Sequence, residues 1–414
     1  MKMKLFDYQK EILEKTKYQN KVALFLDMGL GKTFIGSEKL IQLDEKINLV
    51  VCQKSKINDW MNHFKEFYDV KVFNLTKNLN EFLNYQDQCI GIINYDLIFR
   101  RKELLKLKDF TLLLDESSQI QNEKAKRSKF ILKLNSKNNI LLSGTPVSGK
   151  YENLWSQAQL IGWNISKRVY EKQFVKFKQI QVEGLPIKIV DGYKNVNRLK
   201  QKFKDNGAIF LKTEEVLELP KQNFINIFCE LNSEYKKFKK SRIISINNRD
   251  YIGSRILTFR LYLRMMAGIF NKYKLEAFKD LLESSNDRLI VFYNFKEELN
   301  QMLNNCSRKH ISYVNGDIKD LDAYENFEDS ITFIQYQAGS MGLNLQKANK
   351  IIYFSPTESS ELFEQSKKRI HRVGQEKSCF YYFLITKNSI EENIYENLKK
   401  RRDYTNELFK KDIS

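Results

Sequence analysis

Short apolar runs that end in turns or polar clusters recur along the first part of the chain. They are Val22–Leu26, Leu49–Cys52, Cys89–Ile93, Thr111–Leu114 and Ile140–Leu142. Runs of this length without polar alternation are typical of parallel strands that are buried on both faces. The stretches between them have apolar residues at helical spacing, as at Trp60, Phe64 and Phe67. The pattern predicts repeated strand–helix–strand units and a parallel sheet.

A second series of apolar runs lies much later in the chain. It consists of Leu289–Phe292, Ile311–Val314, Ile331–Ile334, Ile351–Phe354 and Phe380–Ile385, and it predicts a second α/β domain. Between the two series, Ser233–Ile246 and Arg255–Ile269 have helix-like patterns with interleaved aromatic and basic residues. We therefore expect an N-terminal lobe over residues 1–160, a largely helical insertion over 161–274 and a C-terminal lobe over 275–414.

The composition indicates a folded chain of several domains. Of 414 residues, 42% are hydrophobic and 29% are charged, with 4 prolines and 16 glycines, which excludes collagen-like repeats and low-complexity disorder. At about 150 residues per domain, this length corresponds to two or three domains. The amino terminus lacks an apolar signal core, and no apolar run approaches the roughly 18 residues that a membrane span needs.

The charge is strongly positive and is concentrated in the middle of the chain. Lys and Arg number 70 against 51 Asp and Glu, a net charge of +19, and residues 161–280 alone carry 25 against 12, a net of +13. A positive field favours a polyanionic partner, either a nucleic acid or an anionic membrane surface. The lack of a membrane segment makes the membrane the weaker alternative. A single run such as Lys236–Lys240 is equally well explained as a solvated surface.

Cysteine and histidine give no sign of a disulfide framework or of a metal centre. The five cysteines are Cys52, Cys89, Cys229, Cys306 and Cys379, odd in number and never in a C-x-x-C pair, and the three histidines are far apart in sequence. Neither a zinc ribbon nor a histidine-rich site is expected. Any metal is expected to arrive with a substrate, and a reducing compartment is the simplest setting.

The first candidate for chemistry follows the first predicted strand. It reads Asp27-Met28-Gly29-Leu30-Gly31-Lys32-Thr33 and leads into a segment with helical spacing. A strand, a glycine-rich turn and a helix that begins with Lys-Thr form the arrangement that cradles phosphates. In this arrangement backbone N–H groups can close on the phosphates, Lys32 can reach the β- and γ-phosphates, and the Thr33 hydroxyl can hold Mg²⁺. The full motif has glycine at position 26, where this chain has Leu26.

The second candidate is an acid pair that ends another predicted strand. Asp115 can bind Mg²⁺ through its carboxylate, while Glu116 orients or deprotonates the attacking water. A capping or surface acid pair is the alternative. Because parallel strands expose their carboxyl ends at one edge of a sheet, Asp115 and Lys32 can meet there. A third strand ends at that edge in the hydroxyl-rich turn Ser143–Pro146.

Two arginines far downstream form the third candidate. Arg369 and Arg372 are three residues apart, so on a helix they share one face, from which guanidinium groups could reach a γ-phosphate as arginine fingers. The alternative is an ordinary basic helix.

The ordered set of motifs resembles the Swi/Snf-type ATPases, the double-stranded-DNA translocases of helicase superfamily two. The motifs are Tyr8-Gln9, Asp27 to Thr33, Leu49 to Cys52 with Trp60, Asn94-Tyr95-Asp96, Asp115 to Asn122, Ser143 to Pro146, Gly339 to Leu345 and Gln365 to Gln375. Phe210 to Val216 followed by Leu219-Pro220 is similar to the segment that joins the two lobes of the family, and Lys274 to Phe278 to the start of its second lobe. The resemblance covers nearly the whole chain, and the string Arg369 to Gln375 is its most family-specific part.

The resemblance implies a fold, an activity and a set of site residues. The fold is two RecA-like parallel-sheet lobes with the basic insertion between them, and the activity is ATP-driven translocation on double-stranded DNA, with ATP and Mg²⁺ bound in the cleft between the lobes. The residues implied in catalysis are Lys32, Asp115, Glu116, Arg369 and Arg372. Those implied in nucleotide binding are Gln9, at the adenine, the loop Met28, Gly29, Leu30, Gly31, Lys32 and Thr33, and Gly342 and Asn344. The metal would be held by Thr33 and Asp115. Gly339, Gly342 and Asn344 would lie in the loop that links DNA contact to hydrolysis.

The chain departs from the family pattern at Leu26, Asp27, Ser117-Ser118 and Lys368, none of which handles phosphate directly. We therefore expect hydrolysis to be intact, while the coupling of hydrolysis to DNA stays open. The chain resembles the compact phage or bacterial members, which places it in the cytoplasm of a bacterial or phage-infected cell. Two alternatives remain: a strand-separating helicase on DNA or RNA, and a nucleic-acid-binding scaffold whose ATPase is weak or gated by a protein partner.

Overall fold

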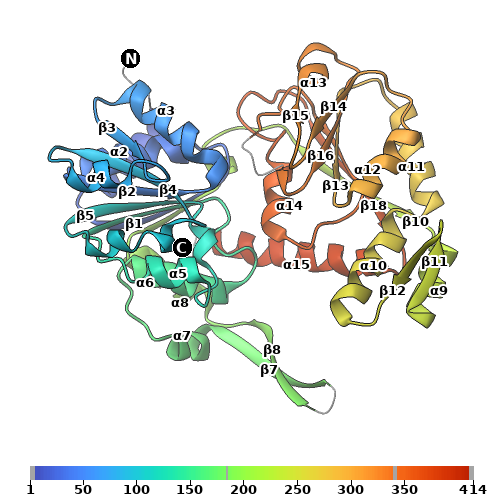
Figure 1. Ribbon diagram of the computed structural model, residues 1–414, viewed down its shortest axis with the longest axis horizontal. Helices are drawn as coiled ribbons and strands as arrows, with labels where there is room; N and C mark the ends of the chain where they lie inside the picture. Colours follow the sequence, from blue (N-terminus) through green and yellow to red (C-terminus); the bar gives the residue numbers. More distant parts are fainter. Residues whose placement is uncertain (1–4, 183–184, 339–342, 410–414) are drawn as a thin grey trace. The chain divides into compact units, whose positions relative to one another are not determined.

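The chain forms two compact units in the structure, which is a computed structural model that describes residues 5–182, 185–338 and 343–409 (Figure 1). One unit contains Met1–Leu217 and Asp403–Ser414, and the other contains Glu218–Arg402. The predicted domain boundaries at residues 160 and 274 stay a prediction. Among the described residues, no helix combines the length and the apolar composition that crossing a membrane would require.

The first unit is built on a seven-stranded sheet. Its strands are β1 (Lys21–Leu26), β2 (Ile47–Cys52), β3 (Lys71–Asn74), β4 (Cys89–Asn94), β5 (Phe110–Asp115), β6 (Asn138–Ser143) and β9 (Ala208–Leu211). They lie in the order β3-β4-β2-β5-β6-β1-β9, and every neighbouring pair is parallel. The predicted parallel sheet and its five predicted strands are confirmed, while β3 and β9 were not predicted.

Both faces of this sheet are buried, which explains why its strands are unbroken apolar runs. In β1, Ala23 and Phe25 belong to the cluster on one face, and Val22, Leu24 and Leu26 belong to the cluster on the other. The second cluster also receives side chains from α1 (Asp7–Lys15), α2 (Lys32–Gln42) and α3 (Ile57–Phe67). The first receives them from α4 (Leu79–Asn84), α5 (Lys126–Ile131), α6 (Trp155–Leu160), α7 (Lys167–Phe174) and α8 (Val196–Asp205).

The second unit has a seven-stranded sheet of its own. The strands are β10 (Gln222–Cys229), β13 (Leu289–Tyr293), β14 (Ile311–Val314), β15 (Lys319–Asp320), β16 (Ile331–Gln335), β17 (Lys350–Tyr353) and β18 (Cys379–Thr386). The order is β10-β18-β17-β13-β16-β14-β15, and all pairs are parallel except β14 with β15. The second series of predicted strands and the second α/β domain are confirmed.

Helices cover both faces of this second sheet as well. One buried cluster includes side chains of α11 (Lys272–Glu283) and α12 (Lys296–Asn304), and the other includes those of α13 (Asp322–Asn326), α14 (Ser360–Lys367) and α15 (Ile390–Phe409). A further cluster joins α9 (Ser233–Ser241), β11 (Ile243–Ile246), β12 (Arg249–Ile252) and α10 (Ile256–Gly268). Each unit is therefore a sheet between two helical layers.

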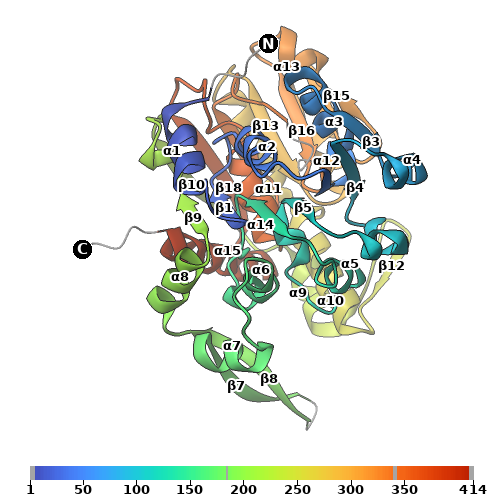
Figure 2. The ribbon, with the colours of Figure 1, turned by 90° about the vertical axis from the view of Figure 1, so that its left-hand side faces the viewer.

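The segment predicted as a largely helical insertion contains nearly as much strand as helix. β9 joins the first sheet, β10 joins the second, and β11 pairs with β12. The hairpin of β7 (Val175–Val182) and β8 (Leu185–Tyr193) extends away from the sheet of its unit, as Figures 1 and 2 both show. Its apolar residues Ile180, Leu185, Ile187 and Val190 are exposed, so its strands are not the unbroken, buried apolar runs from which strands were predicted.

The helix predicted over Ser233–Ile246 ends earlier than the pattern suggested. Helix α9 stops at Ser241, where Arg242 has a φ of 61°, and β11 begins. Asn247 and Asn248 both have positive φ, 51° and 59°, which is the geometry of a two-residue hairpin turn. The Asn-Asn pair after three β-branched isoleucines therefore favours a hairpin over the continued helix.

A fully buried ion pair joins helices α11 and α15 of the second unit. Lys274 Nζ of α11 lies 2.6 and 2.5 Å from the carboxylate oxygens of Glu391 in α15, and the two side chains are 0% and 2% exposed. The N–H of Thr386 donates to Glu391 Oε2 at 3.1 Å. The pair is satisfied internally, so losing one partner leaves an uncompensated charge in the core.

We expect Lys274→Met to lower the free energy of unfolding of the second unit by about 3–5 kcal/mol, because it leaves Glu391 buried and unpaired. Replacing both partners, Lys274→Met with Glu391→Leu, should recover most of that loss. Urea unfolding followed by circular dichroism measures both. The control is Lys296→Met in the exposed pair Lys296–Asp317, whose side chains are 71% and 73% exposed, where the change should stay below about 1 kcal/mol. Equal effects of the two single substitutions would contradict the assignment.

Candidate functional site

The carboxyl ends of three neighbouring strands bring the predicted phosphate-handling residues together. β5, β6 and β1 are adjacent and parallel, so their carboxyl ends meet at one edge of the sheet. In the ladder, Asp115 pairs with Leu142 of β6, and Ser143 pairs with Phe25 of β1. The phosphate loop, residues 27–31, continues from β1 at the same edge.

The phosphate loop turns through two glycines with left-handed backbone. Gly29 has a φ of 88° and Gly31 a φ of 68°, a conformation that strains residues with a Cβ. A Cβ on Gly31 would also lie 2.5 Å from Gln9 Nε2. Helix α2 begins at Lys32, directly after Gly31, so the loop lies against the positive amino end of the helix dipole.

Gln9 holds the phosphate loop from helix α1. Its Nε2 donates to the Leu30 carbonyl at 3.2 Å, and the Tyr8 hydroxyl donates to the same carbonyl at 3.1 Å. The N–H of Phe6 donates to Gln9 Oε1 at 2.9 Å. The amide of Gln9 is therefore engaged with the loop, and its contact with adenine stays a prediction.

Lys32 lies along its own loop, beside the turn that follows β6. Its Nζ donates to the carbonyls of Leu26 at 3.1 Å and Asp27 at 3.3 Å. A Cβ on Gly144 would lie 3.2 Å from this Nζ, so the missing side chain leaves room for the ammonium. Both acceptors are neutral, and a charged phosphate oxygen is the stronger partner. The ammonium is positioned to exchange them for phosphate.

Trp60 of α3 fixes the carboxylate of Asp115. The indole Nε1 donates to Asp115 Oδ2 at 2.9 Å. Burial raises the pKa of Asp115 above its ordinary value, while the hydrogen bond from Trp60 and the charge of Lys32 act in the opposite direction. The carboxylate is thus both oriented and electrostatically linked to the lysine.

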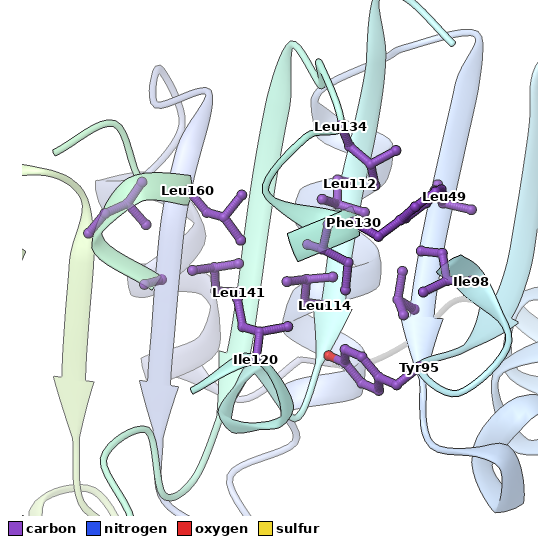
Figure 3. Close-up of a cluster of buried hydrophobic side chains, with 14 of the residues drawn as sticks. Leu49, Tyr95, Ile98, Leu112, Leu114, Ile120, Phe130, Leu134, Leu141 and Leu160 are labelled. Atoms are coloured by element: carbon purple, nitrogen blue, oxygen red, sulfur yellow. The ribbon is translucent and has the colours of Figure 1, made fainter. Parts of the chain in front are cut away.

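Glu116 follows in a conformation that is uncommon for a residue with a Cβ. Its φ and ψ are 53° and 63°, and the Ser143 hydroxyl approaches its Oε2 at 3.5 Å. The Tyr95 hydroxyl donates to the Asp115 carbonyl at 2.9 Å. In Figure 3, the ring of Tyr95 lies at the end of the buried cluster that includes Leu114 of β5. The strained turn is therefore held by a core aromatic residue.

Gln157 of α6 joins the acid-bearing turn to the turn after β6. Its Oε1 accepts from the Ser117 hydroxyl, and its Nε2 donates to the Pro146 carbonyl, both at 2.8 Å. Gln157 is fully buried. It was not identified from the sequence, because a single glutamine in a helix carries no motif signal. Trp60 was noted there for its helical spacing and its place after a strand, and its contact with Asp115 was not predicted.

The edge of the sheet fits a nucleoside triphosphate with Mg²⁺. The backbone hydrogen bonds of the described chain leave the N–H groups of Gly31, Lys32 and Thr33 unused, as donors for phosphate oxygens. The Thr33 hydroxyl and the Asp115 carboxylate are oxygen groups of the kind that Mg²⁺ prefers as ligands. Within residues 5–182, 185–338 and 343–409, no three His, Cys, Asp or Glu side chains cluster to hold a metal themselves.

Arg369 and Arg372 do not share a helical face, and that premise is wrong. Helix α14 ends at Lys367, with Lys368 as its C-cap, so both arginines lie in the turn that follows. Arg369 is buried, and its Nη1 donates to the Leu343 carbonyl at 3.3 Å. Arg372 Nη1 donates to Asn344 Oδ1, and burial lowers its pKa. Both guanidinium groups therefore contact the segment Leu343–Leu345.

The loop that was predicted to link DNA contact to hydrolysis, here called the coupling loop, falls partly outside the described residues. Its predicted residues Gly339 and Gly342 are not among the described residues. Asn344 is exposed apart from its bond with Arg372, and the Leu345 N–H donates to the Arg369 carbonyl at 3.1 Å. We call residues 369–372 the arginine segment. The described end of the loop is therefore attached to the arginine segment both by side-chain and by backbone hydrogen bonds.

The departures from the family pattern fall on residues with structural partners. Leu26 is fully buried in β1 and gives its carbonyl to Lys32, Ser117 binds Gln157, and Ser118 is buried beside it. None of these residues displaces a group at the edge of the sheet.

Comparison with known proteins identifies the family. A model of the SNF2-related domain matches residues 8–275, and a model of the helicase conserved C-terminal domain matches residues 273–374. The ISWI chromatin-remodeling complex ATPase ISW1 of Saccharomyces cerevisiae is 24% identical, over 93% of this chain and 38% of the relative. An uncharacterized ATP-dependent helicase of Mycoplasma pneumoniae is 23% identical, over 94% of this chain and 40% of the relative.

The chain thus spans about two fifths of the length of these relatives. Among solved structures, the Sulfolobus solfataricus SWI2/SNF2 ATPase core in complex with dsDNA is 19% identical with a TM-score of 0.46, over 98% of this chain and 93% of that one. The SNF2-related model covers more than half of the chain, and the chain therefore belongs to the SNF2-related family.

Proposed function

We propose that the protein is an ATP-driven translocase on double-stranded DNA. The proposal rests on one observation: Lys32, Asp115 and Glu116 lie at the same edge of a parallel sheet. The chain also belongs to the SNF2-related family. The whole-chain charge of +19 supports a polyanionic partner. A translocase needs mostly sequence-independent phosphate contacts, which basic surfaces provide.

Each residue at the edge has a distinct role in hydrolysis. The loop N–H groups and Lys32 would bind and orient the phosphates. Thr33 and Asp115 would hold Mg²⁺, which would supply positive charge to the phosphoryl oxygens. Glu116 orients the attacking water and accepts its proton, close to the Ser143 hydroxyl that lies 3.5 Å from its carboxylate. The hydrogen bond from Trp60 orients the Asp115 carboxylate, which would hold the metal.

Arg369 and Arg372 are proposed to act on the γ-phosphate from the second unit. Their contacts with Leu343 and Asn344 support a link between that role and the coupling loop. We also propose that Gln9 and Asn344 contact the nucleotide, that the lobes span residues 1–160 and 275–414, and that the protein works in the cytoplasm of a bacterial or phage-infected cell. The relatives described above are of yeast and mycoplasma origin.

We expect Lys32→Ala to lower the rate of ATP hydrolysis by about 100-fold or more, because the phosphates lose their nearest fixed cation. Phosphate release by the purified chain with saturating duplex DNA measures the rate. Lys129→Ala, an exposed lysine of α5, is the control and should hydrolyse at the native rate. Hydrolysis at the native rate by the Lys32 variant would remove the phosphate-loop assignment.

We expect Trp60→Phe to raise the Mg²⁺ concentration needed for half-maximal hydrolysis by about 10-fold or more, because it removes the hydrogen bond that orients Asp115. The maximal rate should be largely recovered at high Mg²⁺. Trp155→Phe is the matched control, since it also removes an indole hydrogen bond, to the Ile165 carbonyl at 2.8 Å, away from the edge. If both variants shift the Mg²⁺ requirement equally, Trp60 has no special part in holding the metal ligand.

Duplex DNA should stimulate hydrolysis more strongly than single-stranded DNA or RNA, and the stimulation should fall steeply with salt. Phosphate release measured with each nucleic acid at salt concentrations from about 50 to 200 mM tests both effects. Preference for single strands or RNA, together with displacement of a strand from a partial duplex, would favour the helicase alternative. No stimulation by any nucleic acid would favour a scaffold or an ATPase gated by a protein partner.

A further inference from the structure

A short segment carries the chain from the first unit into the second, and both of its ends are anchored at functional motifs. We call it the strap and define it as residues 213–220. It follows β9, the edge strand beside β1, and precedes β10, the first strand of the second sheet. The boundary between the units lies within it, after Leu217.

The first anchor is Thr213 on the phosphate loop. Thr213 is 1% exposed, and its hydroxyl donates to Asp27 Oδ2 at 2.9 Å, with its N–H 3.5 Å from the same oxygen. The other carboxylate oxygen of Asp27 accepts the N–H of Met28 at 2.9 Å. The Asp27 N–H donates to the Leu211 carbonyl at 2.9 Å. The first residue of the loop is therefore bound on two sides to the chain that leads into the strap.

The strap stays attached to the first unit up to the boundary. Thr213–Glu215 form a 3-10 turn, and the N–H of Leu217 donates to the Thr213 carbonyl at 2.9 Å. Val216 and Leu217 pack against the buried cluster that includes α2. A displacement of Thr213 is therefore carried to Leu217 by a compact turn and not absorbed by a loose loop.

The second anchor is Pro220 on the arginine segment. His371, between Arg369 and Arg372, is 2% exposed, and its Nε2 lies 2.9 Å from the Pro220 carbonyl. A carbonyl oxygen only accepts, so Nε2 carries the proton. The Cys379 N–H donates to the Lys221 carbonyl at 2.8 Å, which begins the pairing of β10 with β18. The strap is thus fixed in the second unit from Pro220 onward.

Only Glu218 and Leu219 lie between the two anchored parts. Three virtual bonds from Leu217 to Pro220 span at most about 11 Å, so the strap has little slack. A longer linker would let the two motifs move independently, whereas this one ties the phosphate loop and the arginine segment to the ends of one short chain.

We propose that the strap transmits the state of the phosphate loop to the arginine segment, with Thr213 and His371 as positioning residues. The proposal rests on the proposed ATPase function and adds the route by which nucleotide and DNA sites are coupled. Phosphates that enter the loop move Asp27 and with it Thr213, and the strap biases the position of His371 between the two arginines. Asp27 and His371 therefore act through the strap and not on the reacting atoms.

Hydrolysis kinetics test the proposal. Thr213→Val removes the hydroxyl at nearly constant volume and should lower the ratio of DNA-stimulated to basal kcat by about 5-fold or more, the lower range of allosteric coupling. Thr213→Ser keeps the hydroxyl and should restore the ratio. Thr16→Val removes another buried hydroxyl bond, to the Ile12 carbonyl at 2.8 Å, and should leave the ratio unchanged. An unchanged ratio in Thr213→Val overturns the proposal.

A double-mutant cycle separates transmission from two local effects. His371→Leu removes the donor to Pro220, and His371→Gln retains an amide donor. If the strap is one linkage, adding His371→Leu to Thr213→Val lowers the ratio no further, because the linkage is already cut. Independent, multiplicative losses would instead show two unconnected structural roles and overturn the proposal.

Hydrogen exchange gives a readout that does not depend on turnover. Binding of a non-hydrolysable ATP analogue should change amide protection over residues 367–375 in the native chain and in Thr213→Ser, and this change should be lost in Thr213→Val. If the native chain shows no DNA-stimulated hydrolysis, the proposed function fails while this comparison still judges the strap. A nucleotide-dependent change that persists in Thr213→Val overturns the strap alone.

Discussion

The parallel pairing of β5, β6 and β1 is the constraint on which the candidate site depends. Parallel neighbours end on the same edge, so three segments that are far apart in sequence deliver Asp115, Ser143 and the phosphate loop to one place. Their register is fixed by side chains that are buried on both faces, since a slip of one residue would exchange the two clusters. The chemistry is therefore positioned by backbone hydrogen bonds, and the side chains at the edge refine it.

Contacts from both helical layers of the unit hold those side chains in position. Gln9 and Tyr8 from α1 hold the loop, Trp60 from α3 turns Asp115, and Gln157 from α6 joins the two strand-end turns. Two glycines also contribute to the geometry of the site, because Gly31 and Gly144 have no side chain and leave the space that Gln9 and Lys32 occupy. A site supported from both helical layers keeps its geometry while phosphates exchange with loop carbonyls as partners of Lys32.

Much of this architecture could be predicted from the sequence, for identifiable physical reasons. Buried parallel strands are continuous apolar runs, so β1, β5 and their counterparts in the second unit were predicted within a few residues. β9 and β10 were missed because they are edge strands that carry polar or half-exposed residues. The helical spacing of Arg369 and Arg372 misled because α14 ends at Lys367, two residues before Arg369. Trp60 and Gln157 act across the fold, and such contacts leave no local pattern in the chain.

The place of β9 also bears on how the first unit folds. β1 lies between β6 and β9 in the sheet, so a nascent chain leaves one edge of β1 without a partner until residue 211 has been made. That edge carries the apolar run that leads into the phosphate loop, and an unpaired apolar edge is a template for aggregation. Pairing of strands so distant in sequence also slows folding. We therefore expect a fragment that ends before β9 to aggregate more readily than the whole first unit.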